Sequence, residues 1–358
     1  MTTTLEQYIR DAIIHNGPMR LDHYMTLAGG WYYDHHMPFG HDGDFVTAPE
    51  ICHLFGELIG LWMAHTWGHI GLPLPARWVE LGPGRGTLTR DAWRALGASE
   101  IRNSLTIYLV ENSPTLAAVQ QQTLAGLPAH WHTHIEEVLD SKAEGAVFLV
   151  ANEFFDALPV RQFVRGEQHW HERVVGLLDG ALVLGLAREP LTDITLTAPP
   201  GTVMEWPGAA RQATAAIADL LKQCGGLALI IDYGYRGPRF GDTLQAVRNH
   251  RHVSPLDTPG DADITSHVDF NAIAGEAKRC GLNVHGLTSQ GDFLRGLGIE
   301  VCLNAVEEKV DHETADRYRK AVRRLTGGGR ENMGELFKVM GLTSPDITAL
   351  SALPPYRL

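Results

Sequence analysis

The residues best suited to binding a nucleotide-like ligand form a glycine-rich turn, WVELGPGRG at residues 78–86. A short apolar stretch ends at Glu80, and a helix-compatible stretch begins at Thr87. Glycines between a strand and a helix let the main chain approach a ligand where a Cβ would clash. A dinucleotide motif, G-x-G-x-x-G, would place its last glycine at position 87, so Thr87 argues against a dinucleotide. The glycines of the turn are Gly82, Gly84 and Gly86.

The spacing E-x-G-x-G-x-G resembles instead the first motif of S-adenosylmethionine (SAM)-dependent methyltransferases. SAM carries a ribose and a sulfonium cation, so acidic residues near the turn are expected. Residues 105–110, LTIYLV, predict the next strand, and Glu111 follows it, where a ribose finds its hydroxyl acceptor. Ser113 can cap the next helix, and Pro114 suits its first turn. The alternatives are a plain surface turn and a solvated strand end.

A second group of chemically capable residues, NEFFDALP at 152–159, follows a predicted strand at 146–152. In a doubly wound sheet this strand end faces the bound ligand. Methyl transfer needs an aligned acceptor atom and a group that receives its proton. We expect Glu153 and Asp156 to serve these needs. Alternatively, Asp156 caps a helix starting near Ala157, and the two phenylalanines belong to the core.

Two loops carry further candidates. The first, GDFVTAPE at residues 43–50, precedes a predicted helix that Thr47 can begin, and it could close over a cofactor and exclude water. In the second, DADITSHVDF at residues 261–270, a threonine or serine caps a helix, or Asp263 and His267 lie near the acceptor. The sequence leaves both interpretations of the second loop open.

No metal site is expected. Histidines alternate at His130, His132 and His134, which would place them on one face of a strand, but no carboxylate or cysteine completes a ligand spacing. The four cysteines are far apart and form no C-x-x-C pair. This cysteine usage favours a reducing compartment rather than a disulfide framework.

Composition excludes several classes of protein. The chain has 358 residues, 44% of them apolar, and a net charge of −12, which argues against a nucleic-acid-binding surface. It has no run of about 18 apolar residues, so we expect no membrane span. Because the first residues lack a basic leader and include Glu6 and Asp11, we expect a cytoplasmic location.

The order of predicted elements indicates an α/β protein with a parallel sheet. Residues 1–76 are expected to form an N-terminal helical segment, with helices at 3–16, 21–28 and 50–69 and a loop at 29–49. The core is assigned to 77–160 and 208–358, with a loop-rich insertion at about 235–265 and a helix at 268–280. Residues 161–207 are predicted to be an inserted β-rich element, with a hairpin turn at Asp179-Gly180.

Seven segments in this order resemble the MidA-like methyltransferase family, which includes the mitochondrial assembly-factor methyltransferase for respiratory complex I. The resemblance covers nearly the whole chain and implies a class I SAM methyltransferase fold, with a Rossmann-like seven-stranded sheet whose last strand is antiparallel. The segments are 43–50, FGEL at 55–58, 80–88, 152–159, DYG at 232–234, 263–270 and MGELFKV at 333–339.

The resemblance also implies SAM as cofactor and, as in the mitochondrial members, an arginine of a complex I subunit as acceptor. A guanidinium fits a pair of carboxylates, and the acidic net charge suits a cationic acceptor. The candidate cofactor-binding residues are Glu80, Gly82, Pro83, Gly84, Gly86, Glu111, Asn112, Ser113 and Thr47. The candidate catalytic residues are Glu153, Asp156, Asn152 and His267.

Other functions stay open at this point. A small-molecule methyltransferase and a SAM-binding assembly factor without catalysis share the same cofactor site. A nicotinamide or flavin oxidoreductase is disfavoured by Thr87. The sequence also leaves a homodimer open, because the insertions could contact a second copy.

Overall fold

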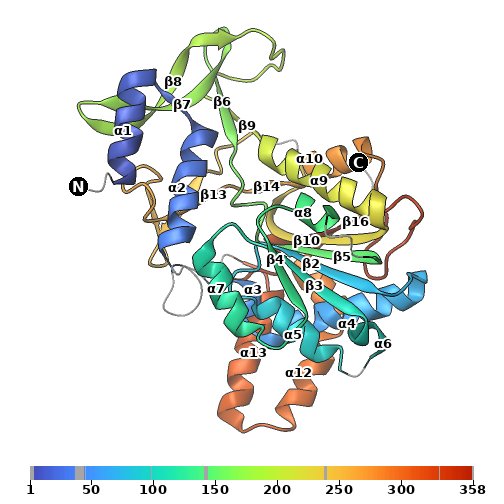
Figure 1. The fold of residues 1–358 in the computed structure, drawn as a ribbon. Coiled ribbons are helices and arrows are strands. Elements are labelled where there is room, and N and C mark those ends of the chain that lie inside the picture. Colours follow the sequence, from blue (N-terminus) through green and yellow to red (C-terminus); the bar gives the residue numbers. More distant parts are fainter. Residues whose placement is uncertain are drawn as a thin grey trace.

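The computed structural model describes residues 4–36, 44, 46–97, 99–140, 144–237, 240–329 and 331–356. Its central element is an eight-stranded sheet, in which seven strands form a row in the order β15-β16-β10-β5-β2-β3-β4 and the short β14 pairs with β10 (Figure 1). The strands are β2 (Ala76–Leu81), β3 (Leu105–Val110), β4 (Ala129–His132), β5 (Ala146–Asn152), β10 (Gly226–Tyr235), β14 (Val268–Asp269), β15 (Asn283–Ser289) and β16 (Phe337–Thr343).

Strand direction confirms the predicted fold class. β2, β3, β4, β5 and β10 run parallel to their neighbours in this group. β16 lies between β10 and β15 and runs antiparallel to both. The sheet is therefore that of a class I methyltransferase, in which the last strand, β16, runs in the reverse direction and lies between β10 and β15.

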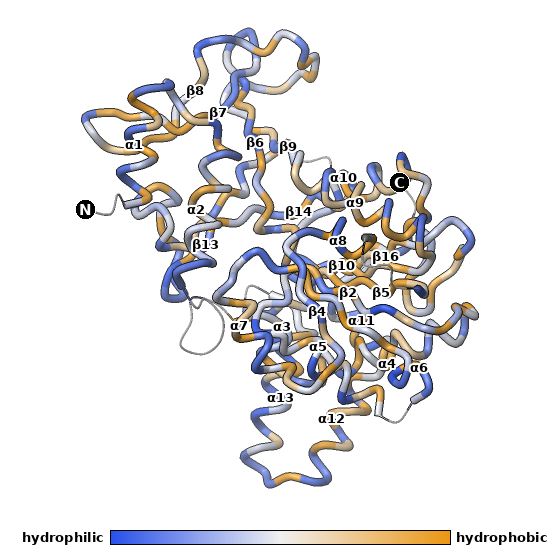
Figure 2. Tube along the Cα trace, in the orientation of Figure 1, coloured by the Kyte–Doolittle hydropathy of each residue, from blue (hydrophilic) through white to orange (hydrophobic). Residues whose placement is uncertain are grey.

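Strand side chains alternate between two apolar layers, because successive residues of a strand point to opposite faces. Phe148 of β5 packs with the helices on one face, and its neighbour Leu149 packs with those on the other. All seven residues of β5 are buried, which explains the continuous apolar sequence of this strand. Figure 2 shows the hydrophobic residues concentrated along the central strands.

Helices cover both faces of the sheet (Figure 1). One layer contains α4 (His53–Ile70), α5 (Thr87–Ala95), α11 (Gln290–Gly296), α12 (Ile299–Glu307) and α13 (His312–Thr326). The opposite layer contains α8 (Glu136–Asp140), α9 (Gly208–Cys224) and α10 (Phe270–Arg279). The remaining helices beside the sheet are α3 (Ala48–Ile51), α6 (Glu100–Asn103) and α7 (Pro114–Thr123).

The N-terminal helices and both insertions form an accessory lobe with its own apolar core, which includes Ile9, Tyr24, Val175 and Ile264. One small sheet has the order β1-β7-β6-β9 with β8 on β7, and another has the order β12-β11-β13. The lobe comprises α1 (Leu5–Asn16), β1 (Met19–Arg20), α2 (Leu21–His35), β6 (Arg161–Arg165), β7 (Trp170–Leu178), β8 (Ala181–Leu191), β9 (Val203–Trp206), β11 (Gln245–Arg248), β12 (Arg251–Val253) and β13 (Asp263–Thr265). The domain boundaries drawn from the sequence stay a prediction.

The structure corrects the expectation of a loop over 29–49. Helix α2 continues to His35, because Tyr24, Ala28 and Tyr32 lie one turn apart and are buried together on one face. Residues 37–43 and 45 of the predicted loop lie outside the described residues. The helix predicted over 50–69 is two helices, α3 and α4, separated by Cys52 with an extended backbone.

The region before α10 also differs from expectation. Residues 235–265 were predicted to be loop-rich, yet they contain the strands β11, β12 and β13. The cap of α10 is Asp269, whose side chain accepts hydrogen bonds from the amides of Asn271 and Ala272. Neither Thr265 nor Ser266 caps this helix. None of the described helices is long and apolar enough to cross a membrane.

Candidate active site

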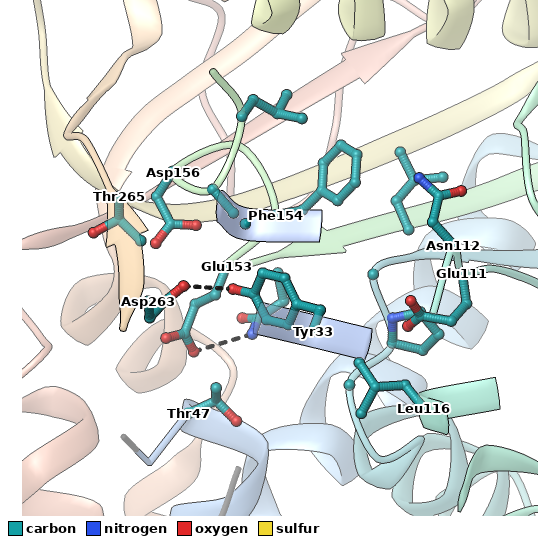
Figure 3. Close-up of a pocket in the computed structure, with 18 of the residues that line it drawn as sticks. Tyr33, Thr47, Glu111, Asn112, Leu116, Glu153, Phe154, Asp156, Asp263 and Thr265 are labelled. Atoms are coloured by element: carbon teal, nitrogen blue, oxygen red, sulfur yellow. Dashed lines mark hydrogen bonds between the residues drawn. The ribbon is translucent and has the colours of Figure 1, made fainter. Parts of the chain in front are cut away.

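A cavity of about 1020 Å³ opens where β2, β3, β5 and β10 end, and α2, α3 and β13 of the surrounding segments complete its wall (Figure 3). The cavity thus lies at the carboxyl ends of the parallel strands, where ligands bind in sheets of this type. Its lining includes every predicted site residue except Gly86. The glycine turn and Glu111, predicted separately, therefore face one space.

The glycine turn has the backbone conformation that its composition predicted. Gly82, Gly84 and Gly86 have φ angles of 60°, 54° and 79°, in the region that favours glycine. A Cβ on Gly82 would lie 3.0 Å from Cδ2 of Phe154. Gly86 is instead the N-cap of α5 and packs near Leu124, so its role is in helix packing rather than in lining the cavity.

Glu80 links the end of β2 to α5 through a hydrogen bond. Its carboxylate accepts a hydrogen bond from the Thr89 hydroxyl, which itself accepts from Nε1 of Trp78 at 2.7 Å. Burial raises the pKa of Glu80 to about 7. This carboxyl group holds the turn in place, and it also lines the cavity.

Glu111 is held by two donors. Its Oε1 accepts from the amide of Ser113 at 2.9 Å, and its Oε2 accepts from Nε2 of Gln120 at 2.9 Å. The fully buried Gln120 also donates to the carbonyl of Gly84 at 2.8 Å and accepts from Nε1 of Trp131 at 3.0 Å. One glutamine therefore joins the glycine turn to the acidic residue of the next strand.

Glu153 follows β5 in a left-handed conformation, with φ of 51°. Such a conformation is uncommon for a residue with a Cβ and occurs mainly at functional sites. Its Oε1 accepts from the amide of Ala48 at 3.0 Å and from Nδ2 of Asn152 at 3.2 Å. Burial, with smaller contributions from the charges of Asp156 and Asp263, raises the pKa of Glu153 to about 8.

Asp156 and Asp263 complete a cluster of three carboxylates with Glu153, and Figure 3 shows all three turned toward one space. The hydroxyl of Tyr33 donates to Oδ1 of Asp263 at 2.8 Å. Burial raises the pKa of Asp156 to about 6 and, together with the charge of Asp156, the pKa of Asp263 to about 7. The charges that act on Glu153 and Asp263 are those of other carboxylates.

The turn between Glu153 and Asp156 does not start a helix, so Asp156 is not the helix cap that one interpretation of the sequence required. Instead, Asp232 accepts hydrogen bonds from the amides of Phe155 and Asp156 at 2.9 and 3.2 Å. Oδ1 of Asp156 and Oδ1 of Asn152 are buried without a hydrogen-bond partner in the described structure. Buried acceptors of this kind are suited to a donor supplied by a ligand.

His267 lines the cavity beside the cluster, with its ring edge-on to that of Tyr233 at 5.3 Å between centroids. The Tyr233 hydroxyl donates to Oγ1 of Thr265 at 2.6 Å and accepts from Nε2 of Gln245 at 3.2 Å. Within the described ranges no group of three His, Cys, Asp or Glu side chains is arranged to hold a metal ion.

Sequence reasoning missed Tyr33, Tyr233 and the segment 133–136, which line the cavity, and Gln120, which supports it through hydrogen bonds. Gln120 had a usable signal, because it lies one turn after the apolar Leu116 on the buried side of α7. Tyr233 lies in the DYG segment at 232–234, which was part of the family resemblance. Tyr33 had no clear signal, because its helix was predicted to end before it.

This sheet, with a glycine turn after one strand and an acidic residue after the next, defines a class I methyltransferase. Residues 58–288 match the family described as "Putative S-adenosyl-L-methionine-dependent methyltransferase". The chain belongs to this family, and its cofactor is SAM.

Similar proteins agree with this assignment. The chain is 32% identical to "Protein arginine methyltransferase NDUFAF7 homolog, mitochondrial" of Drosophila melanogaster, over 95% of this chain and 84% of that protein. It is 33% identical to the Xenopus tropicalis protein arginine methyltransferase NDUFAF7, over 95% and 85%. A solved structure from Burkholderia thailandensis, described as a "likely methyl transferase" bound to S-adenosyl-homocysteine, has a TM-score of 0.83 and 29% identity over 97% of this chain and 94% of that one.

The predicted cytoplasmic location is wrong by this comparison, because these relatives are named as mitochondrial proteins. The prediction rested on the composition of the first residues, with Glu6 and Asp11 in place of a basic leader. That composition describes one segment of the chain and does not determine the compartment.

Proposed function

We propose that this SAM-dependent methyltransferase transfers its methyl group to the guanidinium group of an arginine in a protein. The observation that carries the proposal is the cluster of Glu153, Asp156 and Asp263, which lines the same cavity as the glycine turn. The three carboxyl groups come from two separate segments of the chain. A guanidinium presents five N–H donors in a planar fork, and carboxylates are its best-matched acceptors.

The residues at the other end of the cavity fit the cofactor. The left-handed glycines Gly82 and Gly84 expose main chain without side-chain atoms, and Glu111 presents a fixed carboxylate for the ribose hydroxyls. When bound, SAM supplies an electrophilic methyl group on a sulfonium. We assign Gly82, Pro83, Gly84, Glu111, Asn112 and Ser113 to the cofactor, with Glu80 beneath the turn and Thr47 at the rim.

The carboxylate cluster would orient the acceptor and receive its proton. Burial and, less strongly, the charges of neighbouring carboxylates raise the pKa of Glu153 to about 8 and the pKa of Asp263 to about 7. A bound guanidinium would stabilise their charged forms. When a nitrogen of the guanidinium gains a carbon substituent it must lose a proton, and a carboxyl group whose pKa lies near the working pH is a suitable acceptor.

The names of the relatives support this acceptor, because the Drosophila and Xenopus proteins are called protein arginine methyltransferases. Asn152 and His267 lie beside the cluster, and we assign them to positioning the acceptor. An acceptor within a complex I subunit and a homodimer both stay predictions.

The experiment supplies the full chain with methyl-labelled SAM and pairs of peptides that differ only in carrying arginine or lysine at one position. Hydrolysis and amino acid analysis should place the label in methylarginine, from the arginine peptide alone. Label in lysine would overturn the proposal. In a second incubation, with a cell extract in place of the peptides, label that enters small molecules while protein stays unlabelled would also overturn it.

Variants separate the two ends of the cavity. Asp156→Asn should bind S-adenosylhomocysteine (SAH) normally and lose transfer by roughly 100-fold or more. Glu111→Gln should lose SAH affinity. Asp193→Asn, an exposed change distant from the cavity, is the matched control and should alter neither property. Full transfer by Asp156→Asn would contradict the assignment of the cluster.

A further inference from the structure

A second cavity, of about 760 Å³, lies between the corner that joins α1 to α2 and the first turn of α9. Its lining shares four residues with the main cavity, so the two spaces adjoin each other. The shared residues are Thr26, Pro159, Ala209 and Gln212. Pro159 follows the carboxylate Asp156 by three positions, and the segment 156–159 lines the main cavity throughout.

We propose that this second cavity, the peptide groove, binds the main chain of the acceptor protein next to its methylated arginine. The inference rests on the proposed function. An arginine presented by a protein brings a polypeptide with it, and that polypeptide needs a path out of the site. Pro159, which lines the peptide groove, follows Asp156 of the carboxylate cluster by three positions in the chain, and the groove has a volume of about 760 Å³.

The floor of the peptide groove is made of small residues. Gly17 and Gly208 line it, as does Ala12. A Cβ added to Gly17 would meet no atom within 4 Å, and one added to Gly208 would meet only the ring of Trp206, at 3.5 Å. The space beside Gly17 is therefore open, and the ring of Trp206, which also lines the groove, borders the space beside Gly208.

The polar groups of the groove suit a peptide main chain rather than a charged side chain. Its two guanidinium groups are already engaged: Arg20 with Asp22, and Arg161 with Glu172 through two bonds of 2.7 and 2.8 Å. The charges of the lining are thus balanced within the protein. We therefore expect the groove to accept varied sequences and to bind with little dependence on salt.

Two uncharged amides are available for peptide groups. Asn16 and Gln212 line the groove and are exposed, and in the described part of the chain their side chains form no hydrogen bond. A carboxamide offers both a donor and an acceptor, which matches the C=O and N–H of an extended peptide. The occupant we assign is accordingly an extended, sequence-tolerant segment that flanks the arginine.

The test compares a long and a short acceptor. Asn16→Trp puts a large side chain into the groove at a residue that does not line the main cavity, and Gly208→Leu does so from the opposite wall. With a long arginine peptide, each variant should raise KM roughly tenfold, the effect of losing one or two hydrogen bonds. With acetyl-arginine methylamide, which has almost no flanking chain, KM should match the unmodified protein.

SAH affinity and melting temperature should also be unchanged, and Gln122→Trp on the exposed surface of α7 is the matched control. An unchanged KM for the long peptide in both variants would overturn the peptide groove. An equal rise in KM for both acceptors would do the same, because it would place the effect in the main cavity. If the unmodified protein methylates neither acceptor, the proposed function itself fails, and the inference falls with it.

Discussion

Tyr33 donates a hydrogen bond from its hydroxyl to Oδ1 of Asp263 at 2.8 Å, and this contact joins the accessory lobe's α2 to the carboxylate cluster. The carbonyl of the same Tyr33 accepts from Oγ of Ser113 at 2.7 Å, beside Glu111. One residue of α2 thus contacts both the segment assigned to the cofactor and the segment assigned to the acceptor, and Figure 3 shows the contact with Asp263.

Tyr33→Phe should lower kcat/KM for the acceptor peptide and leave cofactor affinity unchanged. The Tyr33 hydroxyl lowers the pKa of Asp263, so its removal should raise that pKa further above its value of about 7. The acid limb of the pH profile should then move to higher pH. At neutral pH, kcat/KM for an arginine peptide should fall roughly tenfold or more, the cost of a hydrogen bond to a charged group.

SAH affinity should be preserved in this variant, because the Tyr33 carbonyl still accepts from Ser113. Tyr8→Phe, at an exposed tyrosine of α1, is the control. A pH profile identical to that of the unmodified protein would contradict the positioning role of the hydroxyl.

Gln120→Glu should reduce SAH affinity roughly 10- to 100-fold. The substitution removes the donor shared by the Gly84 carbonyl and Glu111, and it places a second carboxyl group against the first. Gln121→Glu makes the same chemical change one residue later at an exposed position, and should bind SAH normally. Isothermal titration with SAH makes the comparison, and equal affinities of the two variants would contradict this role for Gln120.

Gly84→Val should abolish measurable SAH binding in a folded protein. A β-branched residue is strained at φ of 54°, and its side chain would stand where the turn faces the cavity. Gly180→Val is the matched control, because Gly180 has φ of 79° at the tip of a distant hairpin with no atom within 4 Å of an added Cβ. The control should lose stability without losing affinity for SAH.

Glu153→Gln should make the ligand-free protein more stable above about pH 8 while removing activity. The pKa of Glu153 is raised from 4.5 to about 8, so between these values the folded state binds more protons than the unfolded state. The unfolding free energy contributed by this group therefore falls as pH rises through that window. Thermal melts across the window should show a smaller decline in the variant, and equal slopes would contradict the burial of an ionising Glu153.

The sheet and the cofactor side could be predicted from the sequence because their signals are local. Strands such as 146–152 are continuously apolar, and three alternating glycines require a special backbone wherever they occur. The prediction that Glu111 and the glycine turn lie at one site followed from chain order alone, since neighbouring parallel strands end at the same edge of the sheet. This prediction did not depend on knowing where distant loops lie relative to one another.

The acceptor side was only partly predictable, because long-range packing assembles it. Asp263 and His267 had two equally good interpretations, since their surroundings depend on how β13 pairs with β11. Tyr33 was assigned to a loop because residues 29–49 are rich in Gly, His, Asp and aromatic residues, whereas burial of Ala28 and Tyr32 within the accessory lobe keeps this stretch helical. Strand β1 has only two residues, and it forms through pairing with the distant β7.

The position of β16 has a consequence for biosynthesis. This strand, Phe337–Thr343, fills the place between β10 and β15 although it follows both of them in the chain. While the ribosome still holds these residues, β10 has an unpaired edge, which is a hazard for aggregation. Met333, Leu336 and Phe337, which wall the main cavity, are also missing then. The nascent polypeptide therefore carries its glycine turn before the wall of the main cavity is complete.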